Sequence, residues 1–238
     1  ITFDAYTYII KNPAQILNSY KISIIVTVIG TVAGLMFTTG IAYAMSRKDF
    51  KLGKHITRFV MFAMLFHGGL IPTYIVTQVL HLGNTLWVLI LTMLVSPWNI
   101  FLMKSFLSSI PTELLEASFI DGATEYQTYF KVVLPLAKPG LATVGLLILF
   151  SYWNDWYQAM LYIDNMDLVP LQLLLYKIIS NIQFVLQNSF YLASEGGSFP
   201  TIAARMATCV IAIAPMLLAF PFFQKYFVKG MTVGAVKG

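Results

Sequence analysis

The chain has 238 residues, of which 58% are hydrophobic and only 11% are charged, and its formal net charge is +5. Typical soluble domains carry about 25% charged residues. With so few charges the chain cannot cover the surface of a soluble domain of this length, so the composition excludes that class and predicts an integral membrane protein. Because there is one cysteine, Cys209, an intramolecular disulfide is also excluded.

The first predicted span covers residues 22–46, which contain no Lys, Arg, Asp or Glu. The stretch is longer than the roughly 20 residues that cross the hydrocarbon core of a bilayer. Residues 1–20 are interpreted as an interfacial segment that leads into it. Gly30 and Gly34 have the spacing that lets two helices approach closely, and helix packing explains them better than a ligand site.

Five cations follow within residues 47–58. Such a cluster could bind anionic lipid or nucleic acid, but cytoplasmic loops of membrane proteins are also rich in Lys and Arg, according to the positive-inside rule. We therefore interpret this segment as a cytoplasmic loop. The cations are Arg47, Lys48, Lys51, Lys54 and Arg58.

Residues 59–103 again contain no Lys, Arg, Asp or Glu. A single helix of that length would be about 68 Å long, roughly twice the membrane thickness, so the chain must fold back. The turn is predicted at residues 81–84, His-Leu-Gly-Asn, and Pro72 and Pro97 are predicted to kink the flanking helices. His67 is open to two interpretations, a packing histidine or a proton relay. The resulting spans lie near residues 59–80 and 85–107.

The remaining chain predicts a fourth span near residues 140–163, a polar and aromatic loop over 166–198, a fifth span over 201–223 and a basic tail over 224–238. When the loops alternate between the two sides, eleven Lys and Arg lie on one side and four on the other. The side with eleven is cytoplasmic by the positive-inside rule. The tail is then cytoplasmic, Ile1 is outside, and residues 1–238 form a single polytopic, all-α membrane domain.

The polar insert, residues 108–139, holds four of the ten carboxylates of the chain and faces the cytoplasm in this topology. Its residues predict a helix that starts near Pro111, a break at Asp121-Gly122 and a second helix over residues 124–133. Leu134-Pro135 and Lys138-Pro139 are predicted to stop this second helix before the next span. Apolar residues on both helices leave a hydrophobic face. This face suits the membrane surface or a groove on a partner protein.

The polar insert resembles the EAA loop of ATP-binding-cassette (ABC) importer permeases. The resemblance rests on Glu116-Ala117-Ser118, on Gly122 six residues after the glutamate, and on Val132-Val-Leu134-Pro135. Every spacing matches, with Ser118 in place of an alanine and Val132 in place of an isoleucine. The resemblance implies the type I permease fold, with a coupling helix that docks in a cleft on a cytoplasmic ATPase. It assigns this docking to Glu113, Glu116, Ala117, Ser118, Asp121, Gly122, Ala123, Leu134 and Pro135.

The resemblance covers nearly the whole chain. Residues 153–156, Trp-Asn-Asp-Trp, are similar to a signature of carbohydrate-uptake permeases. Residues 224–238 are similar to the end of the maltose-type inner-membrane subunit and of a branch that handles complex oligosaccharides. Those permeases usually have six spans, so we expect that one N-terminal span is absent from this sequence. The maltose-type relatives also contact their ATPases through the tail, which implies contacts by Gly234, Lys237 and Gly238.

Asp155 is an acid well inside an apolar run, and an intramembrane carboxylate is a functional candidate by default. Aromatic faces beside a hydrogen-bonding acid suit sugar rings. The candidate substrate pathway therefore consists of Tyr152, Trp153, Asn154, Asp155 and Trp156. The other interpretation is an aromatic belt at the outer membrane interface, with the two polar residues packed against neighbouring helices.

The sequence contains no phosphate-binding loop, no metal-ligand spacing and no nucleophile–base pair. We therefore expect that this chain is not an enzyme and that it binds no metal and no cofactor. ATP and Mg²⁺ are expected to bind to partner ATPases. The resemblance implies import of oligosaccharide or a related glycan across the bacterial cytoplasmic membrane. The implied partners are a homologous permease, two ATPase subunits, an external solute-binding protein and membrane lipid, and no nucleic acid. A non-sugar solute and an ATP-independent secondary transporter remain alternatives.

Overall fold

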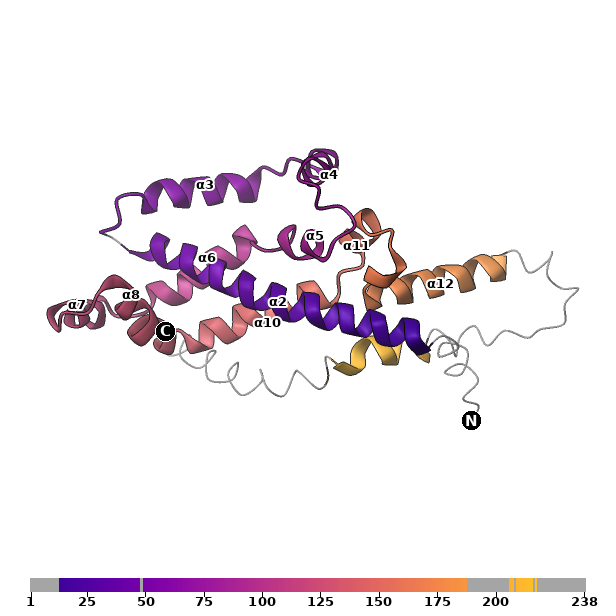
Figure 1. Ribbon diagram of the computed structural model, residues 1–238. Helices are drawn as coiled ribbons and strands as arrows, with labels where there is room; N and C mark the ends of the chain where they lie inside the picture. The colour runs from indigo at the N-terminus through magenta and orange to yellow at the C-terminus, as the bar shows by residue number, and fades with distance from the viewer. Residues whose placement is uncertain (1–12, 48, 188–205, 208, 216, 218–238) are drawn as a thin grey trace, which may run out of the picture.

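The computed structural model describes residues 13–47, 49–187, 206–207, 209–215 and 217. In these residues every regular element is a helix, as predicted for an all-α membrane protein. Figure 1 shows an elongated molecule in which a long first helix runs beside several shorter ones. The predicted tail, residues 224–238 with Gly234, Lys237 and Gly238, lies outside the described residues, as does most of the predicted fifth span.

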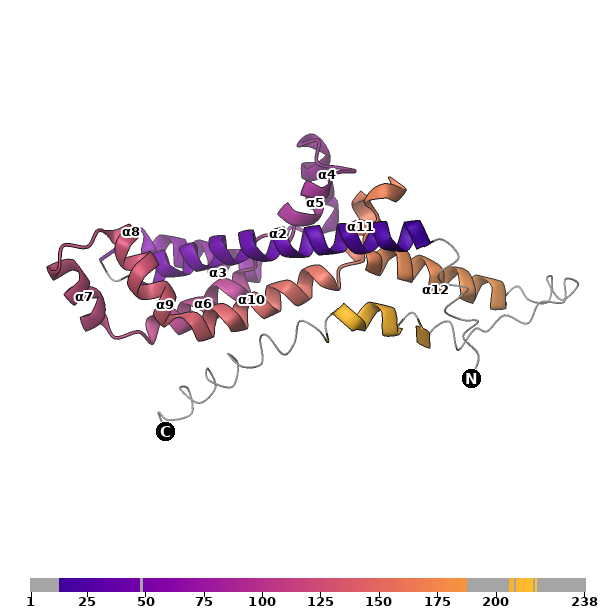
Figure 2. The same cartoon turned by 60° about the horizontal axis from the view of Figure 1, so that its bottom comes forward.

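Helix α2 (Pro13–Ser46) is the central element of the fold. Its 34 residues make a helix about 51 Å long, longer than the hydrocarbon core of a bilayer is thick. Helices α6 (Pro97–Ser108) and α10 (Lys138–Trp153) run along it in both views (Figures 1 and 2). Because α2 begins at Pro13, residues 13–20, which we interpreted as an interfacial segment, are the first turns of the same helix.

Two glycines of α2 mark where the neighbouring helices approach it most closely. A Cβ atom on Gly30 would lie 2.5 Å from the ring of Tyr152, and one on Gly34 would lie 2.9 Å from the carbonyl oxygen of Leu94. The Tyr152 hydroxyl donates to the carbonyl of Ile90 at 2.7 Å, which fixes the ring in place. The interpretation of these glycines as helix-packing positions is confirmed.

The second predicted span is divided into α3 (Gly53–Leu65) and α4 (Leu70–Val79), which are bent by 116° relative to each other. The break lies at residues 66–69, where Gly69 has a φ of +92° and donates its N–H to Nδ1 of His67 at 2.9 Å. Pro72 lies in the first turn of α4, where a missing N–H costs no helical hydrogen bond. The predicted kink at Pro72 is therefore wrong, because the two glycines break the helix before it.

The turn predicted at residues 81–84 is confirmed, with positive φ at His81 (53°) and Asn84 (58°). The third predicted span then divides into α5 (Leu86–Leu91) and α6, separated by residues 92–96. Pro97 is the first residue of α6, a position that favours proline because no intrahelical partner for an N–H exists there. It starts a helix and does not kink one, so that prediction is also wrong.

The fourth predicted span ends early. Helix α10 stops at Trp153, and the short α11 (Tyr157–Tyr162) and a 3₁₀ turn (Met166–Leu168) follow it. Helix α12 (Leu171–Gln187) then occupies about half of residues 166–198, so the interpretation of residues 171–187 as part of a loop is wrong. The reason is an apolar face that begins with Leu171 and Leu173, both fully buried. Figure 1 places α12 near the N-terminal end of α2.

Within the described part of the chain, α2 alone is long and apolar enough to cross a membrane as one helix. The number rises to three if each of two strongly bent pairs counts as a single span. One pair is α3 with α4, and the other joins the end of the polar insert, residues 125–136, to α10. The five-span topology thus stays a prediction.

Candidate functional site

The polar insert forms a pair of short helices at the end of the molecule opposite α12 (Figure 1). Helix α7 (Thr112–Ile120) is followed by a turn at Asp121-Gly122 and by α8 (Glu125–Thr128). Gly122 has a φ of +81°, and a Cβ there would meet no atom within 4 Å. The backbone conformation, and not crowding, therefore favours glycine at this position. The predicted break between two helices is confirmed.

Side-chain hydrogen bonds fix the angle between α7 and α8. Thr124 and Gln127 form a capping box, in which each side chain bonds to the backbone N–H of the other. Ser118 on α7 and Thr128 on α8 are buried, and their hydroxyl oxygens lie 2.9 Å apart. Ser118 stands where the family pattern has an alanine, and its hydroxyl supplies one side of this contact.

The second helix of the insert stops before the next span, as predicted, but it runs past residue 133 and past Pro135. It continues as a π-helical turn (Tyr129–Val133) and a last short turn, α9 (Leu134–Leu136), before an 81° bend into α10. In an α-helix the ring of Pro135 would clash with the carbonyl group of Lys131. The wider π turn moves that carbonyl away, so the helix passes the proline.

The residues assigned to ATPase docking lie mainly on the outer side of this helix pair. Ser118 is buried and faces α8, while an exposed aliphatic residue, Ile120 with 86% of its surface accessible, lies beside the docking residues. The exposed members of the assigned set are Glu113, Glu116, Ala117, Asp121, Gly122 and Pro135, and the half-buried ones are Ala123 and Leu134.

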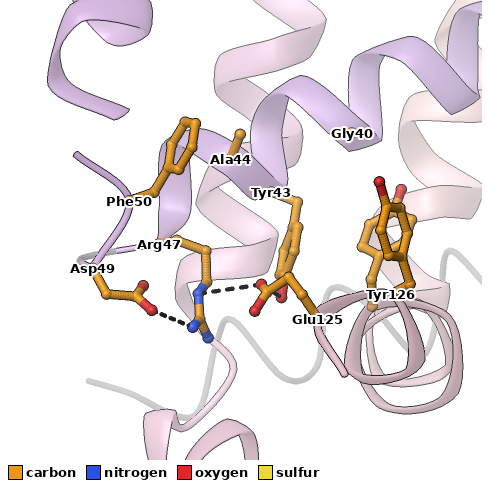
Figure 3. Close-up of a pocket in the computed structure, with 9 residues that line it drawn as sticks. Gly40, Tyr43, Ala44, Arg47, Asp49, Phe50, Glu125 and Tyr126 are labelled. Carbon is orange, nitrogen blue, oxygen red and sulfur yellow. Dashed lines mark hydrogen bonds and ion pairs between the residues drawn. The ribbon is translucent and has the colours of Figure 1, made fainter. Parts of the chain in front are cut away.

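Three residues, which we call the latch, tie the polar insert to the end of α2: Tyr43, Arg47 and Glu125 (Figure 3). The Tyr43 hydroxyl donates to Oε1 of Glu125 at 2.6 Å, and Nε of Arg47 lies 3.6 Å from the same oxygen. The Arg47 guanidinium also bonds Asp49 at 2.6 Å and lies 5.0 Å from the ring centre of Phe119 on α7. Arg47 therefore contacts both helices of the insert, although only 13% of its side chain is exposed.

The latch lines a cavity of about 560 Å³ between α2 and the insert (Figure 3). The ring of Tyr129 in the π turn packs against Tyr43, with ring centres 4.9 Å apart. The end of α2 is thus held by a charge pair, a hydrogen bond and an aromatic contact. A displacement of α7 and α8 can pass into α2 through these contacts.

The sequence reasoning missed the latch. Tyr43 and Glu125 are 82 positions apart, and their pairing follows from the return of the chain past the end of α2. One signal was available, because Arg47 begins the basic segment directly after an uncharged run and Glu125 is a carboxylate of the insert outside the EAA pattern.

Two residues of the candidate substrate pathway are packing residues in this chain. Tyr152 and Trp153 are each only 5% exposed. The Tyr152 hydroxyl is bonded to Ile90 as described, and Nε1 of Trp153 donates to the carbonyl of Ala212 at 3.1 Å. Both polar groups are satisfied inside the fold.

The other three pathway residues lie at the break after α10. The Asp155 carboxylate accepts the backbone N–H of Gln158 at 3.1 Å, so it caps the start of α11. The Trp156 ring stacks on that of Tyr176, with centres 4.4 Å apart, and Asn154 is exposed. The structure therefore divides the predicted pathway residues into two groups. Tyr152 and Trp153 pack inside the fold, and the other three lie at the break after α10.

Residues 30–233 match the family model described as "Binding-protein-dependent transport system inner membrane component". The match covers most of the chain, so the chain belongs to this family and is an inner-membrane permease component of an ABC importer. As a permease component it takes part in transport.

Two relatives and one solved structure are similar to this chain over nearly its whole length. Protein LplC of Bacillus subtilis (strain 168) is 38% identical over 237 residues, covering 100% of this chain and 79% of the relative. The polygalacturonan/rhamnogalacturonan transport system permease protein YtcP of the same organism is 37% identical, covering 100% and 82%. A chain from the crystal structure of a bacterial ABC transporter involved in the import of the acidic polysaccharide alginate matches with a TM-score of 0.83 and 31% identity. That match covers 95% of this chain and 80% of the other, and the predicted permease fold is confirmed.

Removing the Glu125 side chain is expected to loosen the polar insert. Glu125→Ala leaves the Tyr43 hydroxyl and Arg47 without their shared acceptor, and a hydrogen bond of this kind contributes about 1 kcal/mol. Amide hydrogen exchange over residues 112–128 should become faster, whereas exchange in α10 should not change. Glu116→Ala, at an exposed carboxylate of α7, is the control. Equal exchange rates in the Glu125 variant and the control would show that the latch does not hold the insert.

Proposed function

We propose that this chain is the permease subunit of an ATP-driven importer that moves oligosaccharide or a related glycan across the bacterial cytoplasmic membrane by alternating access. The observation that carries the proposal is the helix pair α7–α8, which presents an exposed outer face and is latched to α2 on its inner side. A coupling element needs both features, a surface for a partner and a rigid connection to the spans.

The glycan part of the proposal is supported by the relatives and the structural match. YtcP is named for polygalacturonan and rhamnogalacturonan, and AraQ of Bacillus subtilis (28% identical) for arabinooligosaccharides. The matching crystal structure is of an importer for alginate, another polysaccharide. These substrates share sugar rings joined into chains.

The coupling step begins at the outer face of α7, which docks in a cleft on a cytoplasmic ATPase. ATP and Mg²⁺ bind to the ATPase subunits, and closure of their dimer displaces α7 and α8. Arg47 and Tyr43 carry the displacement to α2. Because α2 is one unbroken helix in close contact with α6 and α10, its movement rearranges the spans around the substrate cavity.

The complete importer contains a second, homologous permease, two ATPase copies and an external solute-binding protein. The excess of Lys and Arg on one side supports a cytoplasmic location for the polar insert and the C-terminal tail. The solute-binding protein then meets the opposite end of the spans, at the side of α12.

The experiment that tests the proposal is uptake of a labelled oligosaccharide into lipid vesicles that contain the purified complete importer. Uptake should require ATP inside the vesicle, on the side of the polar insert, and the binding protein outside. Uptake that proceeds without ATP would instead favour a secondary transporter. ATP-dependent uptake of a non-sugar solute, with none of the oligosaccharide, would refute the glycan part alone.

The same assay separates two roles of Asp155. Asp155→Asn removes the charge but keeps an acceptor for the Gln158 N–H, because asparagine is as good a helix cap as aspartate. Asp155→Ala removes both, and the loss of the cap costs about 1 kcal/mol. If Asp155 faces the substrate, Asp155→Asn should reduce uptake severalfold in a complex of unchanged thermal stability. Normal uptake by Asp155→Asn, together with reduced stability of Asp155→Ala, would leave this residue a purely structural cap.

A further inference from the structure

A second cavity, of about 740 Å³, lies at the same end of the molecule as the latch. It is bounded by the end of α2, the segment that follows it, the start of α3, and α6. Its lining is strongly basic, with four cations from residues 47–58 and one from α6. These cations are Arg47, Lys51, Lys54, Arg58 and Lys104, against a single carboxylate, Asp49.

The positive charge of this basic cavity is largely unneutralised. Asp49 is bonded to Arg47, and among the described residues both ion pairs involve Arg47. The other four cations of the lining therefore have no carboxylate partner in the part of the chain that the structure describes. The start of α3 adds to the positive potential, since its N-cap residue, Leu52, supplies no side-chain acceptor for the first N–H groups.

The basic cavity continues into an apolar surface along one face of α3. Lys54, Arg58, Met61 and Leu65 follow at helical spacing and share that face. The two cations lie at the start of the helix, and the two apolar side chains follow toward its other end. Met61 is 48% exposed and Leu65 is 81% exposed. A ligand that lies along this face needs an anionic head and a long apolar tail.

We propose that the basic cavity binds the headgroup of an anionic phospholipid from the cytoplasmic leaflet, with its acyl chains along α3. Each Lys or Arg near such a headgroup contributes about 1 kcal/mol of electrostatic attraction. An acidic protein surface would match the charge but not the exposed apolar side chains beside it. Figure 1 also shows α7 projecting beyond the ends of α2 and α3, so a docked ATPase lies farther out than this cavity.

The bound lipid would adjoin the coupling element. Arg47 lines the basic cavity and also belongs to the latch, where it lies 3.6 Å from Glu125. A phosphate in the cavity competes with Glu125 for the guanidinium group. Through this site the lipid composition of the membrane changes how strongly the polar insert is coupled to α2. This role goes beyond the proposed transport function.

The test is native mass spectrometry of the purified complete importer, equilibrated with equal amounts of phosphatidylglycerol and phosphatidylcholine. The wild-type complex should retain phosphatidylglycerol in preference to phosphatidylcholine. The variant Lys54→Gln/Arg58→Gln should retain several times less phosphatidylglycerol, with phosphatidylcholine unchanged. The matched control, Lys131→Gln/Lys138→Gln, removes two exposed cations of the insert that do not line the cavity, and should behave as wild type.

A second variant distinguishes the loss of lipid binding from a misfolded α3. Lys104→Gln changes the cavity from α6 and leaves α3 intact, and it should also lower the retention of phosphatidylglycerol. In both variants thermal stability in phosphatidylcholine should equal that of wild type, while the extra stability that phosphatidylglycerol gives the wild type should be lost. Raising the salt from 0.1 to 1 M, which shortens the screening length from about 10 to 3 Å, should weaken the wild-type preference.

Equal retention of the two lipids by wild type would overturn the proposal, as would an unchanged preference in the cavity variants. A preference that appears only after the ATPases are removed would also overturn it, and would assign the cavity to a protein contact. Because the measurement involves no transport, its outcome is independent of whether the importer carries a glycan.

Discussion

Replacing Ala117 by glutamate is expected to release the ATPase subunits from the purified importer. Ala117 is exposed on α7, so the substitution leaves the packing of the insert unchanged, and surface changes of this kind alter stability by about 0.5 kcal/mol or less. In a complex, the new carboxylate is buried against the docking cleft without a partner. Such an uncompensated charge costs about 3–5 kcal/mol, a hundredfold or more in affinity. The measurement is the amount of ATPase that copurifies with the permease pair.

The control for this variant is the same substitution at Ala14. That alanine is also exposed but lies in the first turn of α2, at the end remote from α7, where a carboxylate is well tolerated. Ala14→Glu should keep the full complement of ATPase, and in both variants the second permease should remain bound. Retention of the ATPases by Ala117→Glu would refute the coupling role of α7, even if the chain takes part in transport.

A larger side chain at Gly30 is expected to disrupt the packing of α2 against its neighbouring helices. The first added carbon would lie 2.5 Å from the Tyr152 ring, and that ring is buried and bonded to the carbonyl of Ile90. Overpacking of this kind costs about 1–3 kcal/mol. Gly30→Val should lower the temperature at which the detergent-solubilised importer loses its monodisperse state, and should reduce the yield of assembled complex.

Gly40→Val provides the comparison within the same helix. A Cβ at Gly40 would meet nothing within 4 Å, and valine is no worse a helix former than glycine. Its melting temperature should match or slightly exceed that of wild type. Gly34→Ala should resemble Gly30→Val, because the obstacle there is the backbone carbonyl of Leu94, which cannot rotate away as a side chain can. Equal stability of the Gly30 and Gly40 variants would show that the helices separate easily.

The sequence predicted the features that depend on local composition. The uncharged run after residue 22 predicted α2, the residues Asp121-Gly122 predicted the turn of the insert, and His81 and Asn84 marked another turn. Each of these signals is contained in a few neighbouring residues. The type I permease fold followed from the EAA spacing, which is a property of the family and not of the residues alone.

The errors arose where two local signals compete. Both predicted proline kinks failed, because proline is tolerated in the first turn of a helix, and nearby residues decide where that turn lies. Pro72 follows a pair of glycines, and Pro97 follows a non-helical segment that starts a new helix. The charged and aromatic residues around 166–198 led to the prediction of a loop, although residues of the same segment form the apolar face of α12.

The missed part of the site depends on long-range geometry. The latch unites Arg47 and Glu125 only after α6 has returned the chain past the end of α2, and no local pattern reports that pairing. The substrate pathway shows the opposite difficulty. Its five residues are adjacent in sequence, but Tyr152 is buried within α10, whereas Asn154 follows the end of that helix and is exposed.

The π-helical turn at Tyr129–Val133 makes the length of this segment as important as its composition. A π turn contains more residues than an α turn, so the loss of one residue here would leave an α turn, in which the ring of Pro135 clashes with the preceding turn. In an α-helix each residue advances the chain by about 100° around the axis. A one-residue deletion would therefore rotate the exposed face of α7 out of phase with the spans, although every side chain of that face remained. In this segment, side chains can be exchanged more readily than residues can be added or removed.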